Sequence, residues 1–223
     1  ESSWECLMLN VGFTGGIACG KSTVAAMLVE KGARLIDFDL LAHEVEMPDR
    51  TAWRGIVSVF GEGILKADRT IDRLMLGQVV FSDPEKLRQL NGIVHPAVFT
   101  AWQERLGEIA REDPHAIVLS DVPLLFEVGM QGAFDLVALV YISPEEQVER
   151  LMKRNGFSVE EARARLAAQM SIDDKVGQAD IVINNQGTVE ETRRMIDAVW
   201  AELLRRERGK PDPQAVPRSM GNG

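Results

Sequence analysis

The chain has little cysteine and no long hydrophobic run. Two of its 223 residues are cysteines, Cys6 and Cys19, so no disulfide framework holds the fold together. No segment approaches the roughly 18 consecutive apolar residues that a membrane-spanning helix needs, and the first residues lack the pattern of a secretory signal. These absences exclude a disulfide scaffold and a membrane span, and they predict a reducing, cytoplasmic environment.

Basic residues are in the minority as well. The 25 Lys and Arg residues are outnumbered by 34 Asp and Glu residues, which gives a net charge of −9. A protein with this charge repels nucleic acids and anionic membranes at long range, so neither is an expected partner. A small anion can still bind where cationic side chains and backbone N–H groups gather locally. We expect a monomer or a weak homo-oligomer.

Short apolar runs with strand character alternate with helical patterns, which is typical of a parallel sheet with crossover helices. A helix is predicted over residues 21–31 with Gly32 as its stop, and Ser143, Ser158 and Thr188 each begin a pattern typical of a capped helix. The five expected strands lie near residues 9–14, 33–37, 116–121, 136–142 and 181–184.

The domain organisation follows from the spacing of these strands. The mostly helical residues 40–114 far exceed the dozen or so residues that a simple crossover needs, so they form an insertion. In nucleotide kinases such an insertion holds the phosphate acceptor. We predict one α/β domain over 9–206, with its core at 9–39 and 115–206 and a helical lid at about 150–170. Residues 1–8 are expected to be an extension and 207–223 a disordered tail.

Residues 15–22 read GGIACGKS and fit the phosphate-binding pattern G-x-x-x-x-G-K-[ST]. Glycines let the backbone turn with its N–H groups facing inward at the start of a helix, which forms a nest for phosphate. The pattern follows a predicted strand and opens a predicted helix, as it requires. Lys21 is expected to reach the β- and γ-phosphates of ATP, and the Ser22 hydroxyl to ligate Mg²⁺. The predicted nucleotide-binding residues of this loop are Gly15, Gly16, Ala18, Cys19, Gly20, Lys21, Ser22 and Thr23.

Acidic residues follow two of the predicted strands. Asp37 and Asp39 stand two residues apart, so on a strand both carboxylates point into the cleft at its carboxyl end. Asp39 is the candidate base for an acceptor hydroxyl, whereas Asp37 suits that role and a helix cap equally well. Asp121 ends an apolar strand and is the candidate second Mg²⁺ group, acting through water; the alternative is a turn carboxylate.

A basic helix pair joined at residues 155–157 is the predicted lid. A hinged cationic lid brings positive charge to the transferring phosphoryl group and excludes water. Arg154, directly before the hinge, is the first candidate for this role, although paired surface charges would produce the same composition. Arg165 is the weaker candidate.

The chain resembles the dephospho-CoA kinase family through an ordered set of segments. The resemblance implies a P-loop kinase fold, with a five-stranded parallel sheet and flanking helices, and transfer of the ATP γ-phosphoryl group to the 3′-hydroxyl of dephospho-CoA with Mg²⁺. It further implies that Asp39 is the base and that the loop at Asn185 borders the adenine. The acceptor would be lined by Arg73, His95, Leu124 and Glu127. The segments that carry the resemblance are residues 12–23, 35–39, 71–73, 95–96, 121–127, 154–156, 169–175 and 179–185.

The chain departs from that family at three positions. Ala18 and Cys19 replace the usual glycine and serine of the loop, so the turn is expected not to need a positive φ at Ala18. Cys19, next to Lys21 at a helix N-terminus, is expected to have a lowered thiol pKa and to make the activity sensitive to oxidants. His43 replaces a usual Arg, which predicts a weaker, pH-dependent contact with the acceptor.

Two other functions fit part of this pattern. The first is another P-loop kinase of nucleoside monophosphates or small molecules, which the ordered family segments disfavour. The second is a nucleotide-dependent switch, against which stand the missing guanine-reading Asn-Lys-x-Asp string and the acidic acceptor site.

Overall fold

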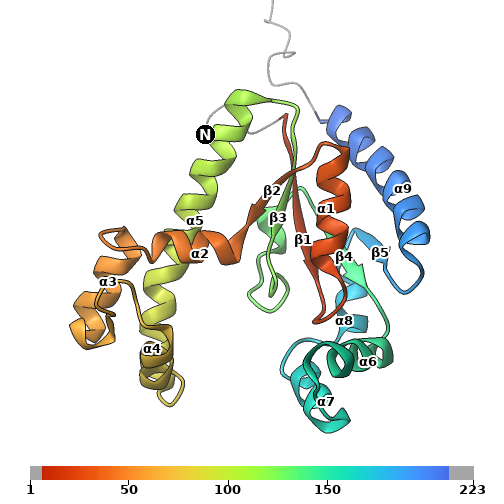
Figure 1. Ribbon diagram of the computed structural model, residues 1–223. Helices are drawn as coiled ribbons and strands as arrows, with labels where there is room; N and C mark the ends of the chain where they lie inside the picture. Colours follow the sequence, from red (N-terminus) through yellow and green to blue (C-terminus); the bar gives the residue numbers. More distant parts are fainter. Residues whose placement is uncertain (1–6, 211–223) are drawn as a thin grey trace, which may run out of the picture. The chain divides into compact units, whose positions relative to one another are not determined.

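The structure is a computed structural model that describes residues 7–210 (Figure 1). It divides into two compact units, Glu1–Ile36 with Gly107–Gly223, and Asp37–Leu106. Most of the predicted extension and tail lies outside the described residues. Helix α9 (Val189–Arg208) ends later than predicted, because Glu207 is buried and accepts a hydrogen bond from His115.

The first unit contains the five-stranded parallel sheet, and this prediction is confirmed. The strands are β1 (Leu9–Gly15), β2 (Arg34–Asp37), β3 (Ile117–Asp121), β4 (Leu136–Tyr141) and β5 (Ile181–Asn184). Their order is β2-β3-β1-β4-β5, and β1 pairs in parallel with both β3 and β4. The chain winds in one direction to β3 and in the other to β4, so the carboxyl end of β1 is the point where such sheets bind ligands.

Alternate residues of β1 show why the sheet is stable. Leu9, Val11 and Phe13 point to one face, where they are at most 2% exposed. Helices α1 (Lys21–Lys31) and α9 cover this face and pack against each other (Figure 1). Their buried residues include Val24 and Leu28 on α1, which lie one turn apart.

Three further helices of this unit follow β4. They are α6 (Pro144–Asn155), α7 (Val159–Ala167) and α8 (Ile172–Val176). The Ser143 side chain caps α6, and full capping boxes begin α7 at Ser158 and α9 at Thr188, as predicted. Gly156, with φ of 70°, ends α6 and separates it from α7.

The second unit is helical. It contains α2 (Phe38–Val45), α3 (Thr51–Phe60), a short 3₁₀ helix (Glu62–Ile64), α4 (Arg73–Val80) and the first part of α5 (Pro84–Glu112). Trp53 and Ile56 are buried in a small core, and the Trp53 indole N–H donates to the Arg69 carbonyl over 2.8 Å. The unit begins three residues and ends eight residues before the predicted insertion, at 37 and 106 rather than 40 and 114.

No helix within residues 7–210 is long and apolar enough to cross a membrane.

Candidate active site

The loop after β1 is the centre of the candidate site. Gly20 has φ of 79° and precedes α1, whose first residue is Lys21. The Cys19 N–H donates to the Gly16 carbonyl over 3.2 Å, so the loop is a tight turn leading into a helix. This is the context that a phosphate-binding loop requires, because the first N–H groups of a helix have no partners within it.

The backbone at Ala18 differs from the prediction. Its φ is 60°, in the left-handed region that glycine adopts without cost. The turn does need a positive φ at this position, so the expectation that it would not is wrong. The carbonyls of the two neighbouring residues, Ile17 and Cys19, accept hydrogen bonds from other parts of the chain, which offset the cost at Ala18.

The burial and the pKa of the Cys19 thiol also differ from the prediction. The side chain is 1% exposed and belongs to the core of the sheet. Burial raises the pKa of Cys19 to about 11, and the lowering by the Lys21 backbone and charge is too small to offset it. The prediction of a reactive thiolate is therefore wrong, because loss of hydration raises the thiol pKa by more than the helix terminus lowers it.

Lys21 and Asp121 are brought together at the carboxyl ends of β1 and β3. The Lys21 ammonium forms an ion pair with the Asp121 carboxylate, and both side chains are largely buried. Asp121 ends β3 as predicted. Ser22, the next residue of α1, is exposed beside them. A cation, a hydroxyl and a carboxylate thus lie at the mouth of the phosphate-binding loop.

Asn185 lies directly after β5, next to the loop. Its side chain is 9% exposed and its Nδ2 donates to the Cys19 carbonyl over 2.8 Å, while its Oδ1 accepts from the Thr192 hydroxyl over 2.8 Å. Both ends of the amide therefore have protein partners. The Asn185 amide thus contacts the phosphate-binding loop, and the expectation that the loop at Asn185 borders the adenine stays a prediction.

The predicted lid begins on α6. Arg154 is exposed, and its Nε donates to Asn155 Oδ1 over 2.9 Å at the end of that helix. Arg165 of α7 stacks on Phe157, with its guanidinium carbon 4.2 Å from the ring centre. Of these two, Arg154 is the one at the turn between the helices.

Leu124 and Glu127 lie in the segment after β3. Leu124 is 41% exposed, as a contact residue would be. Glu127 Oε1 accepts the Met170 N–H over 3.1 Å and lies 2.8 Å from Nζ of the fully buried Lys175. The Lys175 contact has the distance of an ion pair without the direction of a hydrogen bond. Glu127 therefore joins its segment to the residues that follow α7, besides any contact with a substrate.

Three predicted acceptor residues belong to the helical unit. Asp39 is exposed in the first turn of α2, and Asp37 caps that helix by accepting the N–H groups of Asp39 and Leu40. The two carboxylates therefore do not share a strand, because the strand ends at Asp37. The cap role that suited Asp37 equally well is the one observed.

Arg73 and His95 are the other two predicted acceptor residues of the helical unit. Arg73 begins α4; its Nη2 donates to Glu46 over 2.8 Å and lies 3.2 Å from Nδ1 of His43. His43, which replaces the family's usual Arg, thus contacts an arginine of its own unit. His95 is exposed on α5, directly before Pro96.

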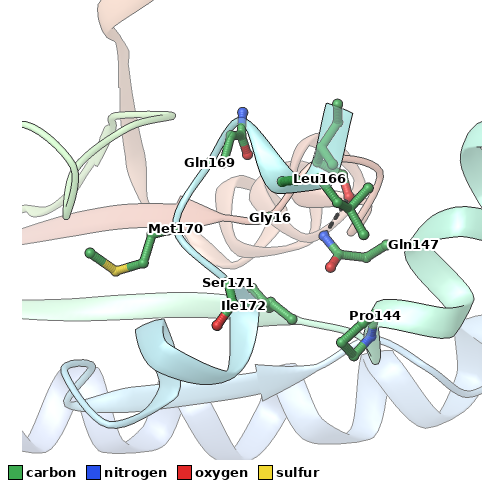
Figure 2. Close-up of a pocket in the computed structure, with 10 residues that line it drawn as sticks. Gly16, Pro144, Gln147, Leu166, Gln169, Met170, Ser171 and Ile172 are labelled. Atoms are coloured by element: carbon green, nitrogen blue, oxygen red, sulfur yellow. Dashed lines mark hydrogen bonds between the residues drawn. The ribbon is translucent and has the colours of Figure 1, made fainter. Parts of the chain in front are cut away.

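Sequence reasoning missed Gln147 of α6. Its Nε2 donates to the Ile17 carbonyl over 2.8 Å, although the side chain is only 3% exposed (Figure 2). A signal existed: Gln147 lies one turn before the buried Leu151, so it is a polar residue on the apolar face of its helix.

Gln147 also lines a cavity of about 200 Å³ next to the loop. Figure 2 shows Gln147, Leu166 and Ile172 on its walls, contributed by α6, α7 and α8. The remaining lining residues are Gly16, Ile17, Pro144, Ala167, Gln169, Met170 and Ser171.

Comparison with known proteins gives a consistent result. The family model described as dephospho-CoA kinase matches residues 9–191. The dephospho-CoA kinase of Syntrophus aciditrophicus is 58% identical over 201 residues, which cover 90% of this chain and 86% of that protein. The dephospho-CoA kinase of Geobacillus kaustophilus is 48% identical over 193 residues, covering 86% of this chain and 96% of that protein.

Solved structures agree with the sequence comparisons. The protein TT1252 from Thermus thermophilus superimposes with a TM-score of 0.74 at 38% identity, covering 87% of this chain and 97% of that one. Dephospho-CoA kinase from Campylobacter jejuni gives a TM-score of 0.60 at 28% identity, covering 88% and 98%.

The φ of Ala18 leads to a prediction about stability. Ala18→Gly should raise the free energy of unfolding by up to about 1 kcal/mol, because glycine adopts the left-handed region without the steric cost of a Cβ. Ala26→Gly on the exposed side of α1 is the control, and it should lower that free energy by about 1 kcal/mol. Urea unfolding measures both, and a loss of stability in Ala18→Gly would contradict the account.

The burial of Cys19 leads to a second prediction. Near pH 7 its thiol is protonated, so iodoacetamide should alkylate it far more slowly than free cysteine, and the rate should rise as the pH approaches about 11. Peptide mapping by mass spectrometry separates Cys19 from Cys6. Alkylation of Cys19 at the rate of a free thiol near neutral pH would show that it is not protected.

Proposed function

The chain belongs to the dephospho-CoA kinase family, and from this premise we propose how its residues carry out the reaction. The activity is transfer of the γ-phosphoryl group of ATP to the 3′-hydroxyl of dephospho-CoA, which gives coenzyme A. The observation that carries it is the 58% identity to a dephospho-CoA kinase over 90% of the chain. The phosphate-binding loop after the central strand is what such a reaction needs at the nucleotide.

The loop 15–23 binds the ATP phosphates. Its backbone N–H groups and the N-terminus of α1 provide hydrogen bonds and a partial positive charge. Lys21 leaves Asp121 to reach the β- and γ-phosphates, where it stabilises the charge that builds up during transfer. The Lys21–Asp121 ion pair supports this role, because it holds the cation at the mouth of the loop.

The site also fits a magnesium ion bound with ATP. Mg²⁺ keeps several waters and takes one or two protein oxygens besides phosphate oxygens, so a cluster of three carboxylates is not required. The Ser22 hydroxyl and the Asp121 carboxylate are oxygen donors of this kind, the latter acting through water. When bound, the ion would be held by these two groups together with ATP and would neutralise the negative charge that develops on the transferring phosphoryl group.

Asp39 orients the 3′-hydroxyl and accepts its proton as the new bond to phosphorus forms. Its exposed carboxylate in the first turn of α2 supports this role, as does the assignment of the helix cap to Asp37 instead. Arg73, His95, Leu124 and Glu127 bind the acceptor.

Arg154 brings positive charge to the phosphoryl group from the lid at about 150–170. Gly156 supports a hinge there, because it ends α6 with φ of 70° and α7 begins three residues later. We further propose a cytoplasmic enzyme that is a monomer or a weak homo-oligomer, supported by the scarcity of cysteine and the net charge of −9.

The direct test of this function is an acceptor panel. The chain is incubated with ATP and Mg²⁺ and with dephospho-CoA, AMP, CMP or shikimate, and release of ADP is followed. Dephospho-CoA should give rapid turnover and the other acceptors little. Rapid turnover with another acceptor and none with dephospho-CoA would overturn the proposal.

Asp39→Asn separates the base from a structural role. The variant should bind ATP with unchanged affinity and lose about 10² to 10⁴-fold in kcat, because the amide cannot accept the proton. Asp37→Asn is the matched control: an Asn caps helices as well as Asp does, so its kcat should stay close to that of the parent. Unchanged turnover in Asp39→Asn would show that Asp39 is not the base.

A further inference from the structure

Two buried amide side chains contact the phosphate-binding loop on its outer side. Gln147 Nε2 donates to the carbonyl of Ile17, and Asn185 Nδ2 donates to the carbonyl of Cys19, each over 2.8 Å. The two side chains are 3% and 9% exposed, and they come from the segments that follow β4 and β5. The segments that follow two neighbouring strands thus each supply one amide to one carbonyl of the loop.

Fixing a carbonyl also fixes the N–H of the next residue. In a planar trans peptide the C=O and N–H bonds point in opposite directions. A carbonyl of Ile17 held outward therefore directs the N–H of Ala18 inward, and a carbonyl of Cys19 held outward does the same for Gly20. Ala18 and Gly20 have φ of 60° and 79°, the left-handed conformations that make successive N–H groups converge in an anion-binding nest.

The glycines of the loop make room for these amides. A Cβ on Gly16 would lie 2.3 Å from Gln147 Nε2, and a Cβ on Gly20 would lie 2.4 Å from Asn185 Nδ2. Side chains at either position would push the amide away from its carbonyl. Glycine is needed at both for the approach of a side chain, and at Gly20 also for the positive φ.

Hydrogen bonds from other side chains fix the position of Asn185 itself. The Thr192 hydroxyl donates to its Oδ1 over 2.8 Å, which leaves Nδ2 facing Cys19. Arg150 Nη2 donates to the Asn185 backbone carbonyl over 2.8 Å and pairs with Glu146. The orientation of the amide follows from these partners, so its donor faces the loop.

We propose that Gln147 and Asn185 are positioning residues for phosphate binding. By fixing the carbonyls of Ile17 and Cys19, they hold the N–H groups of Ala18 and Gly20 in the direction that the ATP phosphates need. The ligand here is the one in the proposed function, on which the proposal rests. Both side chains donate to carbonyls of the loop, so their loss should weaken binding of phosphate and spare binding of the base.

The test uses neutral replacements of similar shape, Gln147→Met and Asn185→Leu, because a new carboxylate would repel phosphate by its charge. Dissociation constants are measured for ATP with Mg²⁺, for inorganic tripolyphosphate and for adenosine. Each variant should raise the dissociation constants for ATP and tripolyphosphate by about tenfold, the effect of one or two misdirected hydrogen bonds. The dissociation constant for adenosine should change by less than about twofold. Thr192→Val leaves Nδ2 in place and should give a smaller change with the same selectivity.

Ile196→Val on α9 is the control for lost stability, because Ile196 is 1% exposed in the core and its side chain has no group that could hydrogen-bond to the loop or its amides. It should leave all three dissociation constants unchanged. If Gln147→Met weakens the binding of ATP and of adenosine equally, or does not weaken the binding of tripolyphosphate, the positioning role is overturned. If Asn185→Leu does not fold, Gln147→Met and Thr192→Val decide the question. A parent chain that does not bind ATP would overturn the proposed function and the positioning role together.

Discussion

The arrangement of the first unit depends on one constraint: the backbone after β1 must turn with its N–H groups facing a common point. That conformation includes a non-glycine residue in the left-handed region, Ala18, and is unfavourable for an isolated chain. It persists because the buried β1 fixes its start, α1 fixes its end, and two amides fix its carbonyls from outside. The side chain of Cys19, a residue of the loop, is also buried in the core of the sheet.

The order of the strands explains why this constraint can be met. With β1 between β3 and β4, the loop is reached from both sides: Asp121 at the end of β3 meets Lys21, and the segments after β4 and β5 supply Gln147 and Asn185. In their contacts with the loop itself, the residue from β3 therefore contributes charge, and the two residues from the segments after β4 and β5 contribute neutral hydrogen bonds. This division suits the chemistry, since charge belongs near the transferring phosphoryl group and neutral donors can support the loop without competing for phosphate.

Much of this could be predicted from the sequence, because it depends on local patterns. The strand of apolar residues, the glycine spacing and the capping residues specify β1 and α1, and the starts of α7 and α9, within a residue. The errors have a common cause in tertiary contacts. The Cys19 thiol was expected to respond to a helix terminus, but its burial has the larger effect on its pKa. Asp37 and Asp39 were placed on one strand, but the chain turns into α2 between them. Gln147 and Asn185 act through carbonyls more than 100 residues away, which no local pattern reveals.

We infer that the loop presents the N–H groups of Ala18 and Gly20 to phosphate. Amide spectra of the ¹⁵N-labelled chain, recorded while a non-hydrolysable ATP analogue is added with Mg²⁺, test it most directly. We expect the amide protons of Ala18 and Gly20 to move to lower field as they bond to phosphate oxygens. Unchanged positions for both protons at saturating nucleotide would contradict it.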